Sequence, residues 1–469
     1  MQNSKLIDSL RQMTDGELQR FRQFVASPYF NKRPELLTLL DYLRGFWPDF
    51  EAGKLTKAAA YEAVHGDVAY EDKQLRYLMS WLTQLAEQFW LIERQSADEV
   101  RNTVQLMDIL SERGLHKAYR KYDRQLQGRF EEAVGRDGAY FYSRQQWAEA
   151  RERHFQRQRQ RRYDPALQET VDYLDRYYYL ERLKLACAML DRQAILQSDY
   201  EIGLDEQWFA QLKKQAFYGE PLIELYYFIF LALQEEGEER YFEQLRNKLD
   251  DMSERIQRDR LREVYHVTIN YCARKIRQGK SKYVREALQL YTVGIEREIL
   301  IERGELSPWA FTNVVKLALR LQRYEWIEGF IKRYSTMLPA GFRENALHYN
   351  LAELYYYTQR LGQAQFHLNQ VAYTDLNYYL GARTMLAKIY YEQQEEEPLL
   401  SLLAAFTIFL KRNKELSSPI KQTFLHFCEL LYQLIRRPQK KLPELKEKIK
   451  STSPLTDRDW LLARLQERL

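Results

Sequence analysis

The chain has 469 residues, 45% of them hydrophobic and 29% charged, so it is long and apolar enough to fold around a large core. Gly (18) and Pro (12) are scarce for this length, which disfavours short-stranded β-sandwiches, propellers and Gly-rich nucleotide loops. The net charge of +5 is a weaker basic excess than a dedicated nucleic-acid binder usually carries. Composition therefore predicts an all-α fold.

The cysteines and the apolar runs indicate in which cellular compartment the protein is expected. Cys187, Cys272 and Cys428 are far apart, show no metal-ligand spacing, and are odd in number, which argues against a secreted disulfide framework. The first residues lack the apolar core of a signal peptide, and the longest uninterrupted apolar run, 225–233, is too short to span a bilayer. We expect a cytoplasmic protein without a membrane association.

Residues 1–98 predict a compact bundle of four helices. A capping box at Thr14 and Glu17 opens the first helix, Pro34 begins the second, and Thr56 caps the third. The fourth begins near Asp72 and carries an apolar stripe at helical spacing, formed by Leu75, Leu78, Leu82, Leu85 and Phe89.

Residues 99–200 predict long, charged helices. Within them, the arginine-rich helix at 151–162 has almost no apolar face, and its arginines are spread around the helix axis. A helix that binds nucleic acid would be expected to gather its charge on one side, so we interpret this one as solvated. Nucleic-acid contact remains the alternative.

Residues 201–469 predict a series of helix pairs, and from Val315 onward one pattern of small, aromatic and apolar positions repeats. The second run begins 37 residues after the first and the third begins 35 residues after the second. Polar turns are predicted inside the three pairs at 320–323, 360–362 and 393–397. The runs are Val315–Ala318–Ile327–Ile331–Tyr334, Ala352–Tyr355–Ala364–Leu368–Val371 and Ala387–Tyr390–Leu399–Leu403–Phe406.

These positions resemble the tetratricopeptide repeat (TPR) family, whose period is about 34 residues. The middle unit carries the family's small residues at Ala352 and Ala364 and its aromatic residue at Tyr355, and Pro339 closes the preceding unit. The resemblance covers residues 308–410, with degenerate helix pairs at 220–254 and 258–297. It implies an N-terminal helical bundle followed by an α-solenoid of TPR-like helix hairpins, which we expect a final helix at 456–469, begun by Thr456, to cap.

In that family the first helix of each unit lines a concave groove that binds a segment of a protein partner. Tyr and Trp offer large contact areas, and Lys or Arg can pair with acidic groups. Carried over to this chain, the expected partner-binding residues are Trp309, Thr312, Lys316, Arg320, Tyr349, Glu353, Tyr356, Tyr357, Thr384, Lys388 and Tyr391.

The N-terminal block, with its segment Ser27–Asn31, is similar to helical bacterial proteins of no known activity, and this similarity implies no function.

The usual motifs of catalysis are missing from the sequence. It contains no phosphate loop, no dinucleotide fingerprint, no nucleophile elbow and no zinc-binding His-Glu-x-x-His helix. His348 and His367 fall on the two helices of one predicted unit and can meet, but we interpret them as packing residues. We therefore expect no enzyme activity, cofactor or metal, and a protein-interaction scaffold as the function. The alternative is a nucleic-acid-associated regulator that uses the N-terminal helices and the 151–162 arginines.

Overall fold

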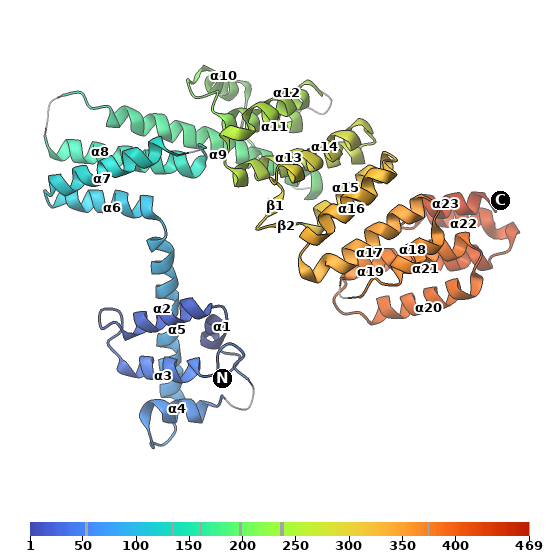
Figure 1. The fold of residues 1–469 in the computed structure, drawn as a ribbon, viewed down its shortest axis with the longest axis horizontal. Helices are drawn as coiled ribbons and strands as arrows, with labels where there is room; N and C mark the ends of the chain where they lie inside the picture. The colour runs from blue at the N-terminus through green and yellow to red at the C-terminus, as the bar shows by residue number, and fades with distance from the viewer. Residues whose placement is uncertain are drawn as a thin grey trace. The chain divides into compact units, whose positions relative to one another are not determined.

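The computed structural model describes residues 1–51, 55–133, 135–159, 162–196, 199–234, 239–373 and 375–468 (Figure 1). Across these residues the fold is all-α, as the composition predicts. The only strands in the described residues are β1 (Ile301–Glu302) and β2 (Glu305–Leu306), which form a small antiparallel hairpin. Short 3₁₀ turns occur at Ser253–Arg255, Ser335–Met337 and Gln439–Lys441.

The chain divides into two compact units, Met1–Glu181 and Arg182–Leu469, and the boundary lies within α9. The three predicted regions, 1–98, 99–200 and 201–469, stay a prediction. The helices of the first unit, together with α9, are α1 (Lys5–Arg11), α2 (Asp15–Ala26), α3 (Pro34–Arg44), α4 (Lys57–His65), α5 (Asp72–Ser96), α6 (Glu99–Glu112), α7 (His116–Glu131), α8 (Gly138–Arg157) and α9 (Ala166–Leu196).

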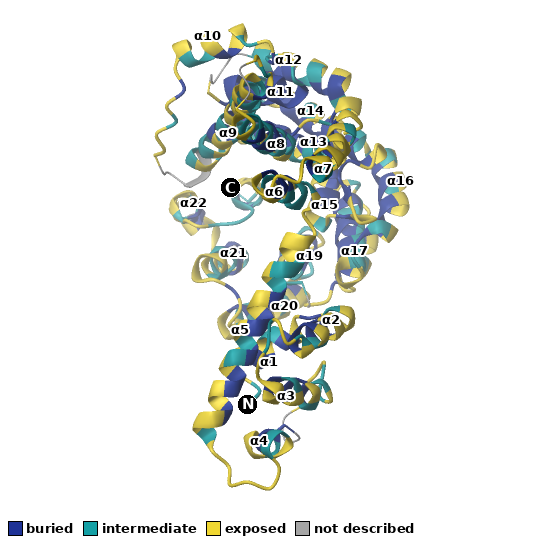
Figure 2. Ribbon diagram, turned by 90° about the vertical axis from the view of Figure 1, so that its left-hand side faces the viewer, coloured by how far each residue is buried: buried dark blue, intermediate teal, exposed yellow. Residues whose placement is uncertain are grey.

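The N-terminal bundle contains the four predicted helices and one more. Thr14 forms the capping box with Glu17, donating its backbone N–H to Glu17 Oε2 at 2.8 Å, and Thr56 caps α4. The predicted stripe of α5 is buried along one face of that helix (Figure 2). The additional helix, α1, is capped by Ser4 and packs against α5.

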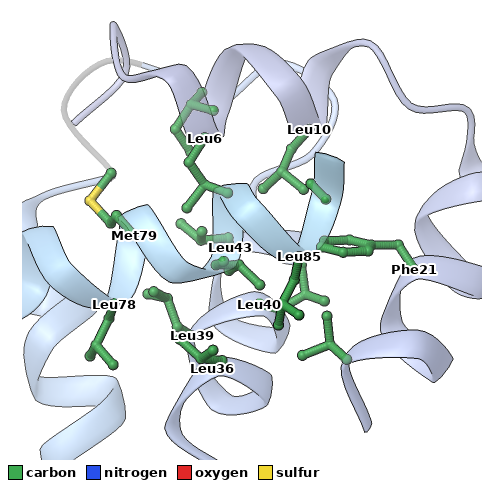
Figure 3. Close-up of a cluster of buried hydrophobic side chains, with 14 of the residues drawn as sticks. Leu6, Leu10, Phe21, Leu36, Leu39, Leu40, Leu43, Leu78, Met79 and Leu85 are labelled. Atoms are coloured by element: carbon green, nitrogen blue, oxygen red, sulfur yellow. The ribbon is translucent and has the colours of Figure 1, made fainter. Parts of the chain in front are cut away.

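The core of this bundle is a single apolar cluster (Figure 3). Leu6 and Leu10 of α1 enter it together with side chains of α2, α3 and α5. Because α1 is only seven residues long, its stability depends on burying this face against its neighbours.

The second unit is built from consecutive helix pairs. Their helices are α10 (Glu206–Lys214), α11 (Pro221–Gln234), α12 (Glu239–Met252), α13 (Arg258–Arg277), α14 (Lys282–Glu296), α15 (Pro308–Arg320), α16 (Tyr324–Tyr334), α17 (Ala340–Tyr357), α18 (Leu361–Leu368), α19 (Leu376–Glu392), α20 (Glu396–Arg412), α21 (Ser418–Arg436), α22 (Leu442–Ser451) and α23 (Arg458–Gln466).

Contacts in this unit follow the chain order. Each of α13, α15, α17 and α19 packs against the helix that follows it, and α15 also contacts α17, which in turn contacts α19. Thirteen of the fifteen positions of the predicted pattern are buried, and the other two, Tyr355 and Tyr390, are half-buried. The small residues of the pattern therefore lie where consecutive helices approach closely.

The three predicted hairpins turn in the same way. The turns occupy 321–323, 358–360 and 393–395, so the second lies two residues before its predicted place and Gly362 is already helical. At the centre of each, a glutamine (Gln322, Gln359 or Gln394) has a positive φ of 54°, 58° or 60°. In each turn the next N–H donates to a carbonyl five residues earlier, at 3.0, 2.8 and 2.9 Å, which closes a Schellman motif.

The C-terminal helix begins later than predicted. Thr456 does not cap it, because Asp457 adopts a left-handed conformation (φ 50°) and α23 begins only at Arg458. Leu461 and Leu465 of this helix are buried against α21 and α22. The predicted last residue, Leu469, lies outside the described residues.

Candidate functional site

A polar cleft of about 360 Å³ lies along the first helices of the three hairpins, and we call it the Glu353 cleft. Seven of the eleven predicted partner-binding residues line it. The cleft is lined by Lys316 of α15, Tyr349, Glu353, Tyr356 and Tyr357 of α17, Asn377, Gly381, Thr384, Met385 and Lys388 of α19, Phe424 of α21, and Thr456 and Asp457 of the loop before α23.

The central charges of the cleft occupy one equivalent position in the three hairpins. Lys316, Glu353 and Lys388 are separated by the same 37 and 35 residues as the repeated pattern. Each follows directly after a buried residue of that pattern, so the helical period turns all three toward the same side of their helices. The result is a row of lysine, glutamate and lysine across α15, α17 and α19.

Glu353 is the buried, middle member of this row, with a relative exposure of 7%. Its Oε1 accepts a hydrogen bond of 3.2 Å from the Tyr349 hydroxyl, whereas its Oε2 is buried and has no hydrogen-bond partner among the described residues. Burial raises the pKa of Glu353, and the positive charges of Lys316 and Lys388 oppose that rise. Neither lysine is close enough to form an ion pair with it.

The two lysines differ in their surroundings. Lys388 Nζ forms an ion pair of 2.8 Å with Asp457 Oδ1 and lies 5.1 Å from the Tyr356 ring centroid. Lys316 is exposed, lies 6.0 Å from the Tyr349 ring centroid, and has no ion-pair partner in the described part of the chain. One lysine therefore already binds a carboxylate of the protein, and its equivalent does not.

The tyrosines of the cleft are fixed by their neighbours. Tyr356 donates its hydroxyl to Glu392 Oε1 at 2.7 Å, and Trp460 donates to the same oxygen at 2.8 Å. Burial raises the pKa of Tyr356, and burial together with the nearby Glu353 carboxyl raises that of Tyr349. Both phenols therefore remain protonated donors at neutral pH.

Gly381 allows Tyr349 to reach Glu353. A Cβ atom at position 381 would lie 2.8 Å from both Cε2 and the hydroxyl oxygen of Tyr349. Since Tyr349 is itself buried, its ring has little room to move aside. The position of the Tyr349 hydroxyl thus depends on the absence of a side chain on the neighbouring helix.

Four predicted residues lie outside the cleft. Thr312 is buried and makes hydrogen bonds with Tyr378 (2.9 Å) and Asn350 (3.2 Å), so it serves packing. Arg320 and Trp309 are exposed, the latter to 66%. Tyr391 lines a separate pocket of about 420 Å³ near Arg464 and Arg468.

Other lining residues were not expected from the sequence. Asn377 and Met385 flank the predicted positions on α19 and a wider helical face would have included them. Phe424 and Asp457 come from beyond the third hairpin, where the repeated pattern has ended, and no periodicity points to them.

The arginine-rich helix is shorter than predicted. It ends at Arg157 rather than 162, because Arg159 has a left-handed backbone (φ 50°) that a right-handed helix cannot continue, and Arg161 lies outside the described residues. Its arginines are paired within the first unit: Arg151 with Glu169 (2.9 Å), Arg153 with Asp108 and with Glu149 (2.9 Å), and Arg157 with Glu112 (3.1 Å).

Two of the first residues of α5, Gln74 and Arg76, contact neighbouring polar side chains. Asp72 pairs with both Lys57 (2.7 Å) and Arg76 (2.9 Å), and Tyr61 donates a hydrogen bond to Gln74 at 2.5 Å. The contacts with Lys57 and Tyr61 join the N-terminal end of α5 to α4, and the pair of Asp72 and Arg76 lies within α5.

The paired histidines and the three cysteines lie outside the Glu353 cleft. His348 and His367 meet as predicted, with their Nδ1 atoms 2.8 Å apart. The three cysteines are free and buried, and burial raises the pKa of each thiol, that of Cys428 to about 12. The described residues contain no group of three or more His, Cys, Asp or Glu side chains placed to hold a metal ion. None of the helices in those residues is both long and apolar enough to cross a membrane.

Comparison with known proteins adds no family: no protein-family model matches the chain, and the search of curated proteins found no match.

Proposed function

We propose that this protein is a non-enzymatic interaction scaffold whose TPR-like hairpins form an α-solenoid and bind an extended segment of a protein partner in the Glu353 cleft. The observation that carries the proposal is the row of Lys316, Glu353 and Lys388, contributed by equivalent positions of three consecutive hairpins. A row of this kind suits an extended segment, because successive residues of that segment can meet successive hairpins.

The surroundings of the row support the same function. Tyr357 is 55% exposed at the cleft and Tyr356 is half-buried there, and the described residues supply no ion-pair partner for the Lys316 ammonium group. Aromatic rings held by their neighbours give contact area at a low entropic cost, and an unpaired charge gives specificity. The proposal places the scaffold in the cytoplasm, in line with three free cysteines.

The nucleic-acid alternative gains less support. Arg151, Arg153 and Arg157 already have carboxylate partners in their own unit, so binding phosphates would require those pairs to open. Lys316 of the cleft has no ion-pair partner among the described residues, so binding there would require no such opening.

The test compares capture of partners by matched variants of the full chain. The cleft variant is Lys316→Ala with Tyr357→Ala, and the control is Phe366→Ala, which removes an exposed aromatic residue of α18 outside the cleft. Each tagged chain is incubated with nuclease-treated extract of the source cells, and bound proteins are identified by mass spectrometry. We expect a partner that the wild type and Phe366→Ala retain and the cleft variant loses, with all three chains unfolding at the same temperature.

Two results would contradict the proposal. The first is equal retention of every partner by the folded cleft variant. The second is loss of all partners on nuclease treatment, which would favour the nucleic-acid regulator.

A further inference from the structure

The Glu353 cleft already contains one bound carboxylate. Asp457, from the loop before α23, places Oδ1 2.8 Å from Lys388 Nζ. Lys316 stands at the equivalent position two hairpins earlier and is exposed, without an ion-pair partner among the described residues. In the cleft, Lys388 is thus paired with a carboxylate of the protein, and the equivalent Lys316 is placed to pair with a carboxylate of a ligand.

Glu353, between the two lysines, has one carboxylate oxygen, Oε2, without a hydrogen-bond partner in the part of the chain that the structure describes. Buried polar atoms are nearly always hydrogen-bonded, and leaving one unpaired costs free energy. The Tyr349 hydroxyl is bonded to the other oxygen, Oε1, at 3.2 Å. In the protonated form, Oε2 instead carries an O–H group that can donate to an oxygen of a ligand.

The charges around Glu353 favour an anionic ligand over a cationic one. The ionisable groups that face it are Lys316 of α15, Tyr349 of its own helix, Lys388 and Tyr378 of α19, and Asp457 of the loop. Lys316, Lys388, Glu353 and Asp457 together carry no net charge when all are ionised. A ligand ammonium would meet two lysines, whereas a ligand carboxylate adds one negative charge that a single proton neutralises.

We propose that the Glu353 cleft binds an acidic side chain of the partner between Lys316 and Glu353, and that Glu353 takes up one proton from solvent as this carboxylate binds. The proton moves onto Oε2, which then donates a hydrogen bond to one ligand oxygen while Lys316 Nζ pairs with the other. No covalent bond of the ligand changes. This inference rests on the proposed function and specifies the chemistry of the segment that the cleft selects.

The test uses calorimetric titration of the full chain with three glycine-serine peptides, blocked at both ends, whose central residue is Glu, Gln or Lys. Each titration is run in buffers with different enthalpies of ionisation, because the dependence of the heat on the buffer gives the number of protons taken up. We expect the Glu peptide to bind most tightly, with uptake of close to one proton at neutral pH. Its affinity should fall by up to about tenfold for each pH unit on raising the pH, as one linked proton requires.

The isosteric variant Glu353→Gln separates this mechanism from simple charge pairing. Its amide donates from the same place without titrating, so it should bind the Glu peptide with no proton uptake and with an affinity that no longer depends on pH. Lys316→Ala should lower the affinity for the Glu peptide at least tenfold while leaving the Gln peptide little changed. Phe366→Ala should behave as the wild type.

Three results would overturn the inference. These are binding of the Glu peptide by the wild type without proton uptake, preference for the Lys peptide with loss of that preference in Glu353→Gln, and binding of none of the three peptides at millimolar concentration. The last result leaves the scaffold proposal standing if the partner captured by Phe366→Ala is still lost by the cleft variant. If the cleft variant also kept that partner, both the inference and the scaffold proposal would be rejected.

Discussion

The arginines of α8 and the lysines of the Glu353 cleft carry the same charge in different settings. Arg151, Arg153 and Arg157 form the denser basic cluster in the sequence, yet each has a carboxylate partner on a neighbouring helix. Lys316 stands alone in a less basic stretch and has no such partner within the described residues. The density of charge in a sequence therefore says less about binding than whether the fold supplies the opposite charge.

The largest effect that separates the two regions should come from charge reversal. Lys316→Glu places a like charge against an acidic ligand, so we expect its affinity for the Glu peptide to fall by more than about tenfold. Its stability should change by less than about 0.5 kcal/mol, since Lys316 is exposed. Peptide affinity by calorimetry and urea unfolding by circular dichroism would measure the two.

Arg157→Glu is the matched variant in the first unit. It puts a negative charge beside Glu112 and Asp108, and it should lower stability by up to about 1 kcal/mol without changing peptide affinity. If Arg157→Glu weakened binding of the Glu peptide as strongly as Lys316→Glu does, the contrast between α8 and the Glu353 cleft would be wrong.

Close packing should distinguish the cleft from the surface ion pairs. In Gly381→Ala the new methyl group meets the Tyr349 ring, and we expect a loss of about 1–3 kcal/mol in stability. Peptide affinity should also fall, because the Tyr349 hydroxyl is displaced from Glu353. Urea unfolding and calorimetry measure these losses.

Gly362→Ala provides the control for that substitution. Position 362 is also helical, but a Cβ there meets nothing within 4 Å. The same change should raise stability by about 0.5–1 kcal/mol through helix propensity alone. A similar gain in Gly381→Ala would show that the ring moves freely.

The smallest effect should be a dependence of stability on pH in both units. Burial lowers the pKa of His154, whose Nδ1 shares a hydrogen bond of 2.8 Å with the Ser111 hydroxyl. Burial also lowers the pKa of His367, which lies beside His348. Since the unfolded chain protonates these groups more readily, their contribution is present above the ordinary pKa of 6.5 and is lost as the pH falls through the lowered values. We expect the urea midpoint to fall on acidification from pH 7.5 to 5.5.

The variants for this measurement share a Glu353→Gln background, because the raised pKa of Glu353 changes stability in the opposite direction. His154→Gln and His367→Gln should each reduce the dependence on pH. Unchanged slopes in both would contradict the assignment to these two histidines.

Much of the local structure was accessible from the sequence because it depends on nearby residues. The capping box of Thr14 and Glu17, the stripe of α5 and the three hairpins follow from spacing and cap chemistry, and the structure contains them. The short helix α1 was missed because its seven residues gain stability only from the tertiary core.

The candidate site likewise contains residues that the sequence could predict and contacts that it could not. Lys316, Glu353 and Lys388 could be selected because the repeat places them on equivalent faces. The sequence could not indicate that Asp457 pairs with Lys388, 69 positions earlier in the chain, or that Thr312 forms hydrogen bonds with Tyr378 and Asn350. Those contacts depend on how distant helices pack, which periodicity does not encode.

The left-handed glutamines at the three turns also bear on how such a chain can change in length. Gln322, Gln359 and Gln394 leave the backbone in the same conformation at intervals of 37 and 35 residues. A stretch running from one glutamine to the next can therefore be duplicated or excised with its ends in register, so that the following helix keeps its phase. Each such event adds or removes one member of the row formed by Lys316, Glu353 and Lys388, so a gene that gains or loses whole units would change the order of charges along the cleft of its product.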